Sequence, residues 1–272
     1  MELDVNGSGG PQKAYAYTGG KPFDPALPVV VFVHGALHDH SVWTLLARWF
    51  AHHGHAVLAL DLPGHSRSAG PPLESIGALA HWLLEVLDAA QVGSAALVGH
   101  SMGSLVALEA AALAPQRARR LAMIGTAYPM AVSPALLDTA RDAPLRAIDM
   151  VNSYSHSTLA AKPSYPGPGS WLHGGNRALM RRVLAGAPER NLFSLDFEVC
   201  NGYAGGFEAA ARVSCPTTLI LGARDQMTQP PQAAELATAL HADVSMVAAG
   251  HALIAEAPDA VLAALRKALA ET

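Results

Sequence analysis

The sequence Gly99-His100-Ser101-Met102-Gly103 is the most informative stretch of the chain, because it places a serine between two glycines where a strand pattern meets a helix pattern. Residues 94–98 are apolar with strand character, and residues 104–114 form a helical pattern that ends at Pro115. A serine in this context is typical of a nucleophile elbow, a strained turn that lifts the hydroxyl above a sheet. An ordinary glycine-rich turn is the alternative, but it does not need a strand before it and a helix after it.

The residue types at this turn have physical reasons. Gly99 and Gly103 lack a Cβ where the strand and the helix come closest together. The helix that follows directs free N–H groups and a positive dipole end at the turn, which suits an oxygen that becomes negative during a reaction. The turn therefore presents Ser101 as a candidate nucleophile.

Strand and helix patterns alternate around this turn. The turn-rich pattern of residues 1–27 predicts one or two edge strands joined by a hairpin. Buried strands are indicated by continuous apolar runs at residues 28–33, 56–60, 94–98, 121–124, 217–221 and 244–247. Helices are indicated at residues 41–53, 73–90, 104–114, 231–240 and 257–269. This alternation predicts an α/β fold with a mostly parallel central sheet and helices on both faces.

The composition changes from about residue 128 to residue 212, where prolines interrupt short helical patterns. No linker brackets the region, so we expect a helical cap (128–212) inserted into an α/β core (1–127 and 213–272). Aromatic and methionine side chains are scattered through the cap, and most of them are expected to pack against the core. Three of them are predicted to bind substrate: Met150, Tyr154 and Trp171.

Composition excludes several classes of protein. The chain has 272 residues, 51% hydrophobic and 15% charged, with a net charge of -4, so no basic surplus points to nucleic acid. No apolar stretch is long enough for a membrane span, and the first four residues lack the pattern of a signal peptide. We expect a cytoplasmic protein without a membrane partner, in which Cys200 and Cys215 are free thiols.

Two more candidate residues follow the ends of predicted strands. Asp225 comes just after residues 217–221, and His251 comes just after residues 244–247. A serine hydroxyl needs a base to become a nucleophile, and the base needs an acid that orients it. Asp225 alone is equally a turn aspartate, and His251 alone is more often a loop histidine. With Ser101 they stand in the order serine, acid, histidine, which predicts a catalytic triad.

Five stretches in order resemble the α/β-hydrolase family, and the likeness covers nearly the whole chain. They are His34-Gly35, residues 61–68 (DLPGHSRS), residues 99–103 (GHSMG), residues 221–225 (LGARD), and Gly250-His251 followed by residues 256–258 (EAP). One departure follows the acid, because residues 227–231 (MTQPP) stand where many relatives carry a short polar-proline pair.

The resemblance implies a role for each site residue. Ser101 would be the nucleophile, His251 the general base and later the acid, and Asp225 the carboxylate that orients it. The oxyanion hole would consist of the backbone N–H groups of Met102 and Ala36. Leu37 is the alternative to Ala36 as the second donor, and it is also a predicted substrate contact.

The histidine-rich loop after residue 35 raises the question of a metal. His38, Asp39 and His40 offer ligand atoms, but no partner stands at a diagnostic spacing, so we predict no metal and place them at the pocket rim. The other candidates are expected to be structural. His34 and His100 should brace the oxyanion loop and the elbow, while Asp61 and His65 should belong to a turn.

The serine at the elbow narrows the reaction that the resemblance implies. Relatives that open epoxides or displace halide use an aspartate there, so Ser101 points to acyl transfer to water through an acyl-enzyme. We predict hydrolysis of a carboxylic ester, lactone or thioester with an apolar acyl or alcohol group, without a cofactor. Carbon–carbon hydrolysis of the meta-cleavage type is the alternative; its acidic substrates usually need an arginine, such as Arg177, Arg181 or Arg182. A non-catalytic ligand-binding module on the same fold is the other alternative.

Overall fold

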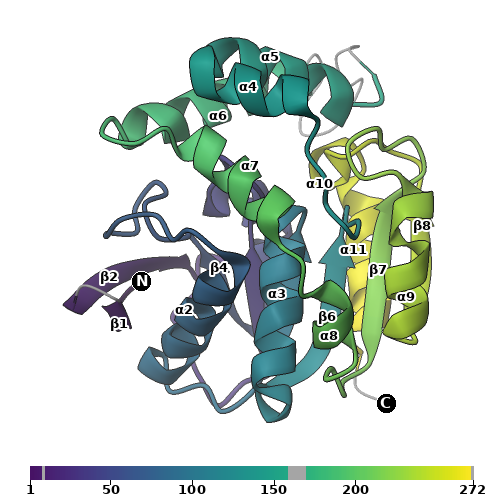
Figure 1. Ribbon diagram of the computed structural model, residues 1–272. Coiled ribbons are helices and arrows are strands. Elements are labelled where there is room, and N and C mark those ends of the chain that lie inside the picture. Colours follow the sequence, from purple (N-terminus) through teal and green to yellow (C-terminus); the bar gives the residue numbers. More distant parts are fainter. Residues whose placement is uncertain (8–9, 159–169, 271–272) are drawn as a thin grey trace.

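A single eight-stranded sheet runs through the molecule (Figure 1), and the computed structural model describes residues 1–7, 10–158 and 170–270. The strand order is β1-β2-β4-β3-β5-β6-β7-β8. Strands β3 to β8 pair in parallel, whereas β1 and β2 pair antiparallel at one edge. The strands are β1 (Glu2–Gly7), β2 (Gly10–Tyr17), β3 (Val29–Val33), β4 (Ala56–Leu60), β5 (Ala95–His100), β6 (Ala118–Ile124), β7 (Thr217–Gly222) and β8 (Asp243–Val247). The expected mostly parallel sheet is confirmed.

Helices follow most strands. The 3-10 helices are η1 (His40–Trp43), η2 (Pro115–Arg117) and η3 (Pro230–Ala233). The α-helices are α1 (Thr44–Ala51), α2 (Ile76–Ala89), α3 (Met102–Leu113), α4 (Pro134–Asp142), α5 (Pro144–Ser155), α6 (Leu172–Gly186), α7 (Leu192–Gly202), α8 (Gly206–Ala210), α9 (Ala234–Ala239), α10 (Leu253–Glu256) and α11 (Pro258–Ala268). Several of them begin later than the sequence pattern suggests. Helix α2 begins at Ile76 because the Ser75 side chain accepts a hydrogen bond from the Ala78 N–H and caps the helix there.

The sheet divides the core into two layers. Along β3, Val29, Val31 and Val33 pack with one apolar cluster, while Val30 and Phe32 pack with the other. This alternation is the period of two expected for a strand that is buried on both faces. Helices α2 and α3 belong to the first layer, and α1 and α11 belong to the second.

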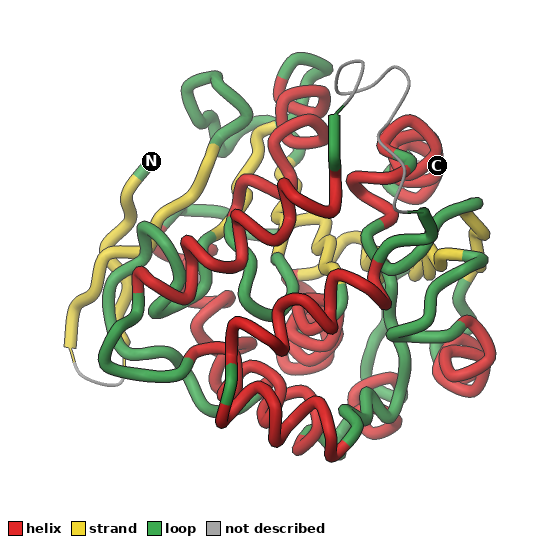
Figure 2. Tube along the Cα trace, turned by 90° about the horizontal axis from the view of Figure 1, so that it is seen from above, coloured by secondary structure: helices red, strands yellow, loops and turns green. Residues whose placement is uncertain are grey.

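The segment between β6 and β7 contains helices α4 to α7 and lies over the carboxyl ends of the parallel strands. We call this segment the cap. Figure 1 shows α4, α5 and α6 above the carboxyl ends of the parallel strands, with α7 returning toward α8. Seen from above, helices lie in front of the strands (Figure 2). The cap therefore covers the end of the sheet that carries the elbow and the two other predicted triad residues.

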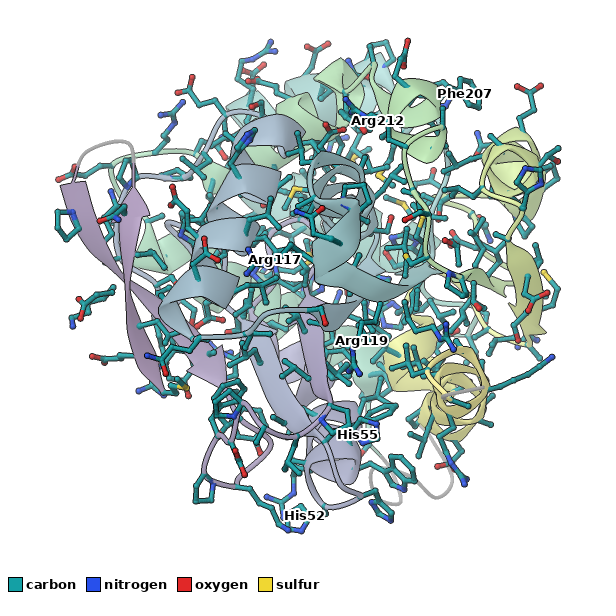
Figure 3. The ribbon with its side chains drawn as sticks, turned by 90° about the horizontal axis from the view of Figure 1, so that it is seen from below. His52, His55, Arg117, Arg119, Phe207 and Arg212 are labelled. Carbon is teal, nitrogen blue, oxygen red and sulfur yellow. The ribbon has the colours of Figure 1, made fainter. Side chains whose placement is uncertain are left out.

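Several cationic side chains lie at the opposite end of the sheet, near the amino ends of the parallel strands (Figure 3). Arg117 binds the backbone oxygens of Val92 and Gly93 and pairs with Asp88, which ties the chain before β6 to the turn before β5. A cavity of about 610 Å³ lies at this edge and is lined in part by His55 and Arg119. None of the predicted site residues lines it.

Among the described helices, none has the length and apolar character needed to cross a membrane.

Candidate active site

Ser101 lies at the sharp turn between β5 and α3. Its backbone has φ 51° and ψ −121°, a conformation that a residue with a side chain seldom adopts. Its N–H donates to the Ile124 carbonyl oxygen of the neighbouring strand at 2.9 Å, which holds the turn against the sheet. A Cβ on Gly99 would lie 2.1 Å from the Gly103 carbonyl oxygen, and one on Gly103 would lie 2.3 Å from that of Val33. The two glycines are therefore required by close approach, as the sequence pattern indicated.

Asp225 and His251 form a buried hydrogen-bonded pair. The His251 Nδ1 lies 2.8 Å from Asp225 Oδ2, and these residues follow the neighbouring strands β7 and β8. Asp225 Oδ1 accepts the N–H groups of Met227 and Thr228 at 2.8 and 2.9 Å. Burial disfavours the charged carboxylate, but His251 and the bonds from Thr228 outweigh it and lower the pKa of Asp225. The carboxylate is therefore ionised at neutral pH and orients the imidazole.

Thr228 was not singled out from the sequence. Its hydroxyl donates to Asp225 Oδ2 at 2.8 Å, and its oxygen lies 3.0 Å from His251 Nδ1. It stands in the segment 227–231, where the chain departs from many relatives. The departure itself was the only signal in the sequence that pointed to this residue.

Ser101 and His251 line one cavity of about 380 Å³ beneath the cap. Ala36 and the predicted substrate contacts Met150 and Tyr154 line it as well. The apolar remainder of the lining includes Met130, Leu136 and Phe197. Among the residues that line it in the described part of the chain there is no arginine or lysine. The cavity therefore suits an uncharged group.

Two predicted substrate contacts do not lie at this cavity. Trp171 lines a second cavity of about 400 Å³, between η1, α6 and α10, and its side chain is 52% exposed. Leu37 is fully buried in the core beneath the loop, because its left-handed backbone (φ 52°) turns the side chain inward. Neither side chain therefore lines the cavity of Ser101, since periodicity and loop position do not specify the direction of a side chain.

The structure distinguishes between Ala36 and Leu37, the two alternatives for the second oxyanion donor in the loop after β3. The Leu37 N–H donates to the Asp196 carboxylate at 2.7 Å, so it is not available to a substrate in this conformation. The Ala36 N–H has no acceptor among the described residues, and Ala36 lines the cavity of Ser101. The Met102 N–H stands at the first position of α3, where no carbonyl of the helix is available to it.

His34 and His100 brace this region as the sequence suggested. His34 Nδ1 lies 2.8 Å from the Gly35 oxygen, and its Nε2 accepts the Leu62 N–H at 3.1 Å. His100 Nε2 lies 3.0 Å from the His251 carbonyl oxygen. Burial and the charge of His251 lower the pKa of His100 to about 3, and burial and His65 lower that of His34. Both rings are therefore neutral hydrogen-bonding braces.

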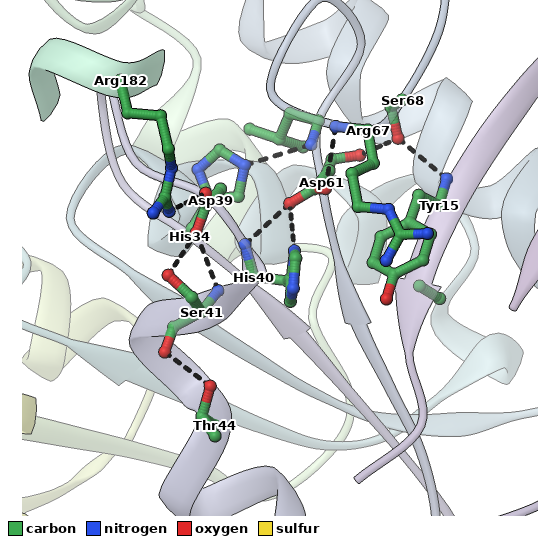
Figure 4. Close-up of polar contacts among 12 residues, drawn as sticks. Tyr15, His34, Asp39, His40, Ser41, Thr44, Asp61, Arg67, Ser68 and Arg182 are labelled. Carbon is green, nitrogen blue, oxygen red and sulfur yellow. Dashed lines mark hydrogen bonds and ion pairs between the residues drawn. The ribbon is translucent and has the colours of Figure 1, made fainter. Parts of the chain in front are cut away.

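Asp39, His40 and Asp61 place one possible metal-ligand atom each within 4.8 Å of one another (Figure 4). The carboxylate oxygens already have protein donors. Asp61 Oδ1 accepts from the N–H and Nδ1 of His40, and Asp39 accepts from Ser41 and Arg182. Burial opposes ionisation, but these hydrogen bonds outweigh it and lower the pKa of Asp39 to about 2. Each of the three side chains therefore has a hydrogen-bond partner in the protein, and Asp39 lies in the interior rather than at the pocket rim.

The cap arginines and the cysteines also have defined places. Arg177 pairs with Asp149 within the cap, and Arg182 pairs with the buried Asp39 of the core.

Both cysteines are free thiols, as expected. Cys200 lines the cavity of Ser101, and burial raises the pKa of its thiol, so the inert thiol form prevails.

Comparison with known proteins agrees with this architecture. The model of the alpha/beta hydrolase fold family matches residues 28–156. An enol-lactonase from Burkholderia xenovorans has the same fold with a TM-score of 0.82 and 21% identity, over 100% of both chains. An esterase from Exiguobacterium antarcticum has a TM-score of 0.82 and 14% identity over 98% of each chain. The fold is therefore that of the α/β hydrolases, as the five sequence stretches predicted.

Sequence similarity to curated proteins is local. The dihydrolipoyllysine-residue acetyltransferase component of the acetoin cleaving system of Pseudomonas putida is 40% identical over 103 residues, which is 36% of this chain and 26% of that protein. A second curated relative is matched over 38% of its length. The matched segment thus spans about a quarter to two fifths of these relatives.

Proposed function

We propose that the chain hydrolyses a carboxylic ester, lactone or thioester through a serine acyl-enzyme. The observation that carries the proposal is the Asp225–His251 pair, whose histidine lines the same cavity as a serine in the strained elbow conformation. An oriented base and a serine hydroxyl at one cavity are the arrangement that nucleophilic acyl transfer requires. The enol-lactonase and the esterase with the same fold are consistent with this class of substrate.

In the proposed reaction His251 Nε2 takes the proton of Ser101 Oγ while Oγ bonds to the substrate carbonyl carbon. The carbonyl oxygen becomes negative and accepts hydrogen bonds from the N–H groups of Ala36 and Met102. The tetrahedral intermediate then collapses, and the leaving oxygen or sulfur takes the proton from His251. Water, deprotonated by His251, attacks the acyl-enzyme and releases the acid and free Ser101. Asp225 and Thr228 hold His251 throughout.

The lining of the cavity determines the substrate class that we propose. Met130, Leu136, Met150 and Phe197 supply apolar surface beside Ser101, and the volume of about 380 Å³ fits a small molecule. The absence of arginine and lysine from the described lining argues against the acidic substrates of meta-cleavage hydrolases. An uncharged, apolar acyl group of short to medium length is therefore the proposed occupant.

The test is hydrolysis of p-nitrophenyl esters of increasing acyl length by the wild type and by Ser101→Ala. We expect turnover by the wild type, with a clear optimum in chain length, and a loss of about a millionfold in kcat on substitution. An equal rate for both proteins would contradict the serine mechanism. A folded wild type without turnover on any ester or thioester would favour a binding module.

A further inference from the structure

One carboxylate of the cap reaches the loop that carries Ala36. Asp196, on α7, accepts hydrogen bonds at Oδ2 from the Leu37 N–H (2.7 Å) and from His65 Nε2 (3.0 Å). Asp196 is only 3% exposed, and Leu37 and His65 are buried as well. A charged acceptor that is shielded from water makes strong hydrogen bonds. Asp196 therefore joins the cap to the oxyanion loop and to the 61–68 turn at one point.

The surroundings of the partner His65 favour its positively charged form. Its Nε2 faces Asp196, and its Nδ1 faces the Pro63 carbonyl oxygen at 3.2 Å, so both nitrogens face acceptors. A ring that donates from both nitrogens is the imidazolium. Burial opposes this charge, but the Asp196 carboxylate outweighs it and raises the pKa of His65. Asp196 is thus fixed by an ion pair on one side while it holds Leu37 on the other.

The peptide group between Ala36 and Leu37 is held at both of its polar atoms. Asp196 binds its N–H, and His38 Nδ1 lies 2.7 Å from its carbonyl oxygen. Leu37 has φ 52°, in the left-handed region that a leucine rarely adopts, so this conformation needs external support. Fixing this peptide limits rotation at the Ala36 Cα, and Ala36 lines the cavity of Ser101.

Other cap side chains hold the residues that follow. His38 Nε2 lies 2.7 Å from Asn176 Oδ1, and Asp39 Oδ2 accepts from Arg182 at 2.8 Å (Figure 4). Both partners belong to α6, whereas Asp196 belongs to α7. Three consecutive residues of the oxyanion loop are therefore each bound by a cap side chain.

We propose that Asp196 is a positioning residue that sets the oxyanion hole and makes it depend on the docked cap. Its kinetic consequence rests on the proposed function, whereas the loop conformation that it controls does not. Asp196 is not among the described residues that line the cavity of Ser101, and it acts through the Ala36–Leu37 peptide. When α7 is displaced, the Leu37 N–H loses its acceptor and the Ala36 N–H is no longer held toward the substrate oxygen.

The experiment compares Asp196→Ala, Asp196→Leu and Asp196→Asn with a matched control, Ser194→Ala. Leucine has nearly the shape of aspartate without an acceptor, so it separates the hydrogen bonds from a packing defect. Asparagine keeps one oxygen that accepts from both Leu37 and His65. Ser194 is also buried on α7, but its hydroxyl bonds Glu198 and not the loop.

Hydrogen–deuterium exchange of peptides that cover residues 34–40 tests the positioning directly. We expect exchange in this segment to be at least about tenfold faster in the Ala or Leu variant and unchanged in Ser194→Ala. On a p-nitrophenyl ester, kcat should fall about 10- to 100-fold in the Ala and Leu variants with KM within about threefold, since removing one oxyanion donor costs about 10²–10³. Asp196→Asn should recover most of kcat.

Unchanged exchange over residues 34–40 in every folded Asp196 variant would overturn the proposal, as would a rise in KM at constant kcat. If the wild type has no esterase activity, the proposed function fails. The exchange data then still decide whether Asp196 positions the loop.

Discussion

The Thr228 hydroxyl donates a 2.8 Å hydrogen bond to Asp225 Oδ2, the same oxygen that accepts from His251. This contact comes from the segment in which the chain departs from many of its relatives. It gives the carboxylate a second side-chain partner in addition to the histidine. Thr228 therefore shares the task of holding His251 in the orientation that the proposed reaction needs.

We expect Thr228→Val to lower kcat on an activated ester by about tenfold, because a hydrogen bond to a charged group contributes about 1.5–3 kcal/mol and each 1.4 kcal/mol is a factor of ten. Valine keeps the shape of threonine and removes only the hydroxyl. Thr228→Ser keeps the hydroxyl and should remain within about threefold of the wild type. Steady-state kinetics of the three proteins checks this, and equal kcat for Thr228→Val and wild type would mean that the hydroxyl has no role.

Gly99→Ala should lower the free energy of unfolding by about 1–3 kcal/mol, the usual effect of forcing an atom into a packed site. The added Cβ would lie 2.1 Å from the Gly103 oxygen, so the backbone of β5 or α3 has to move. Gly77→Ala is the matched control, since nothing lies within 4 Å of a Cβ at that helical position. Urea unfolding should show a loss for the first variant and none for the second, and equal midpoints would contradict the argument from crowding.

The ion pair of His65 and Asp196 predicts a pH dependence of stability. Asp61 and His34 also face His65, but the Asp196 carboxylate is the largest influence that raises its pKa in the folded state. A histidine whose pKa is higher in the folded state stabilises the fold. This stabilisation is complete below the unfolded pKa of about 6.5 and is lost as the pH rises through the folded pKa.

The free energy of unfolding should therefore fall from about pH 6.5 upward, and this fall should be smaller in Asp196→Asn, which lacks the charge. Denaturant unfolding at a series of pH values measures the difference between the two proteins. A constant difference from pH 6 to pH 9 would show that the pair is not ionic.

Acyl-chain selectivity should depend on Met150, which lines the cavity of Ser101. Met150→Trp fills part of the volume of about 380 Å³, so we expect kcat/KM for longer p-nitrophenyl esters to fall relative to the acetate by tenfold or more. Trp171→Ala enlarges the other cavity and should leave the chain-length profile unchanged. A profile that shifts with Trp171 and not with Met150 would place the acyl group in the second cavity.

The sequence was sufficient for the parallel sheet, the elbow and the pairing of Asp225 with His251, because apolar runs and strand ends follow from local patterns. It was not sufficient for contacts between distant segments. Asp196 looks like any polar residue on a helix, and only the fold of the cap brings it to Leu37. Trp171 and Leu37 lie away from the cavity of Ser101 for a related reason, since the direction of a side chain on a loop or at a helix end depends on tertiary packing.

The proposed reaction depends on Ser101 as an activated nucleophile. The most direct measurement is the intact mass of the protein after incubation with a fluorophosphonate, for the wild type and for Ser101→Ala, followed by peptide mapping. We predict a single adduct on the peptide that contains Ser101 in the wild type and no adduct in the variant. An unlabelled wild type that is folded, or an adduct that persists in Ser101→Ala, would show that Ser101 is not an activated nucleophile.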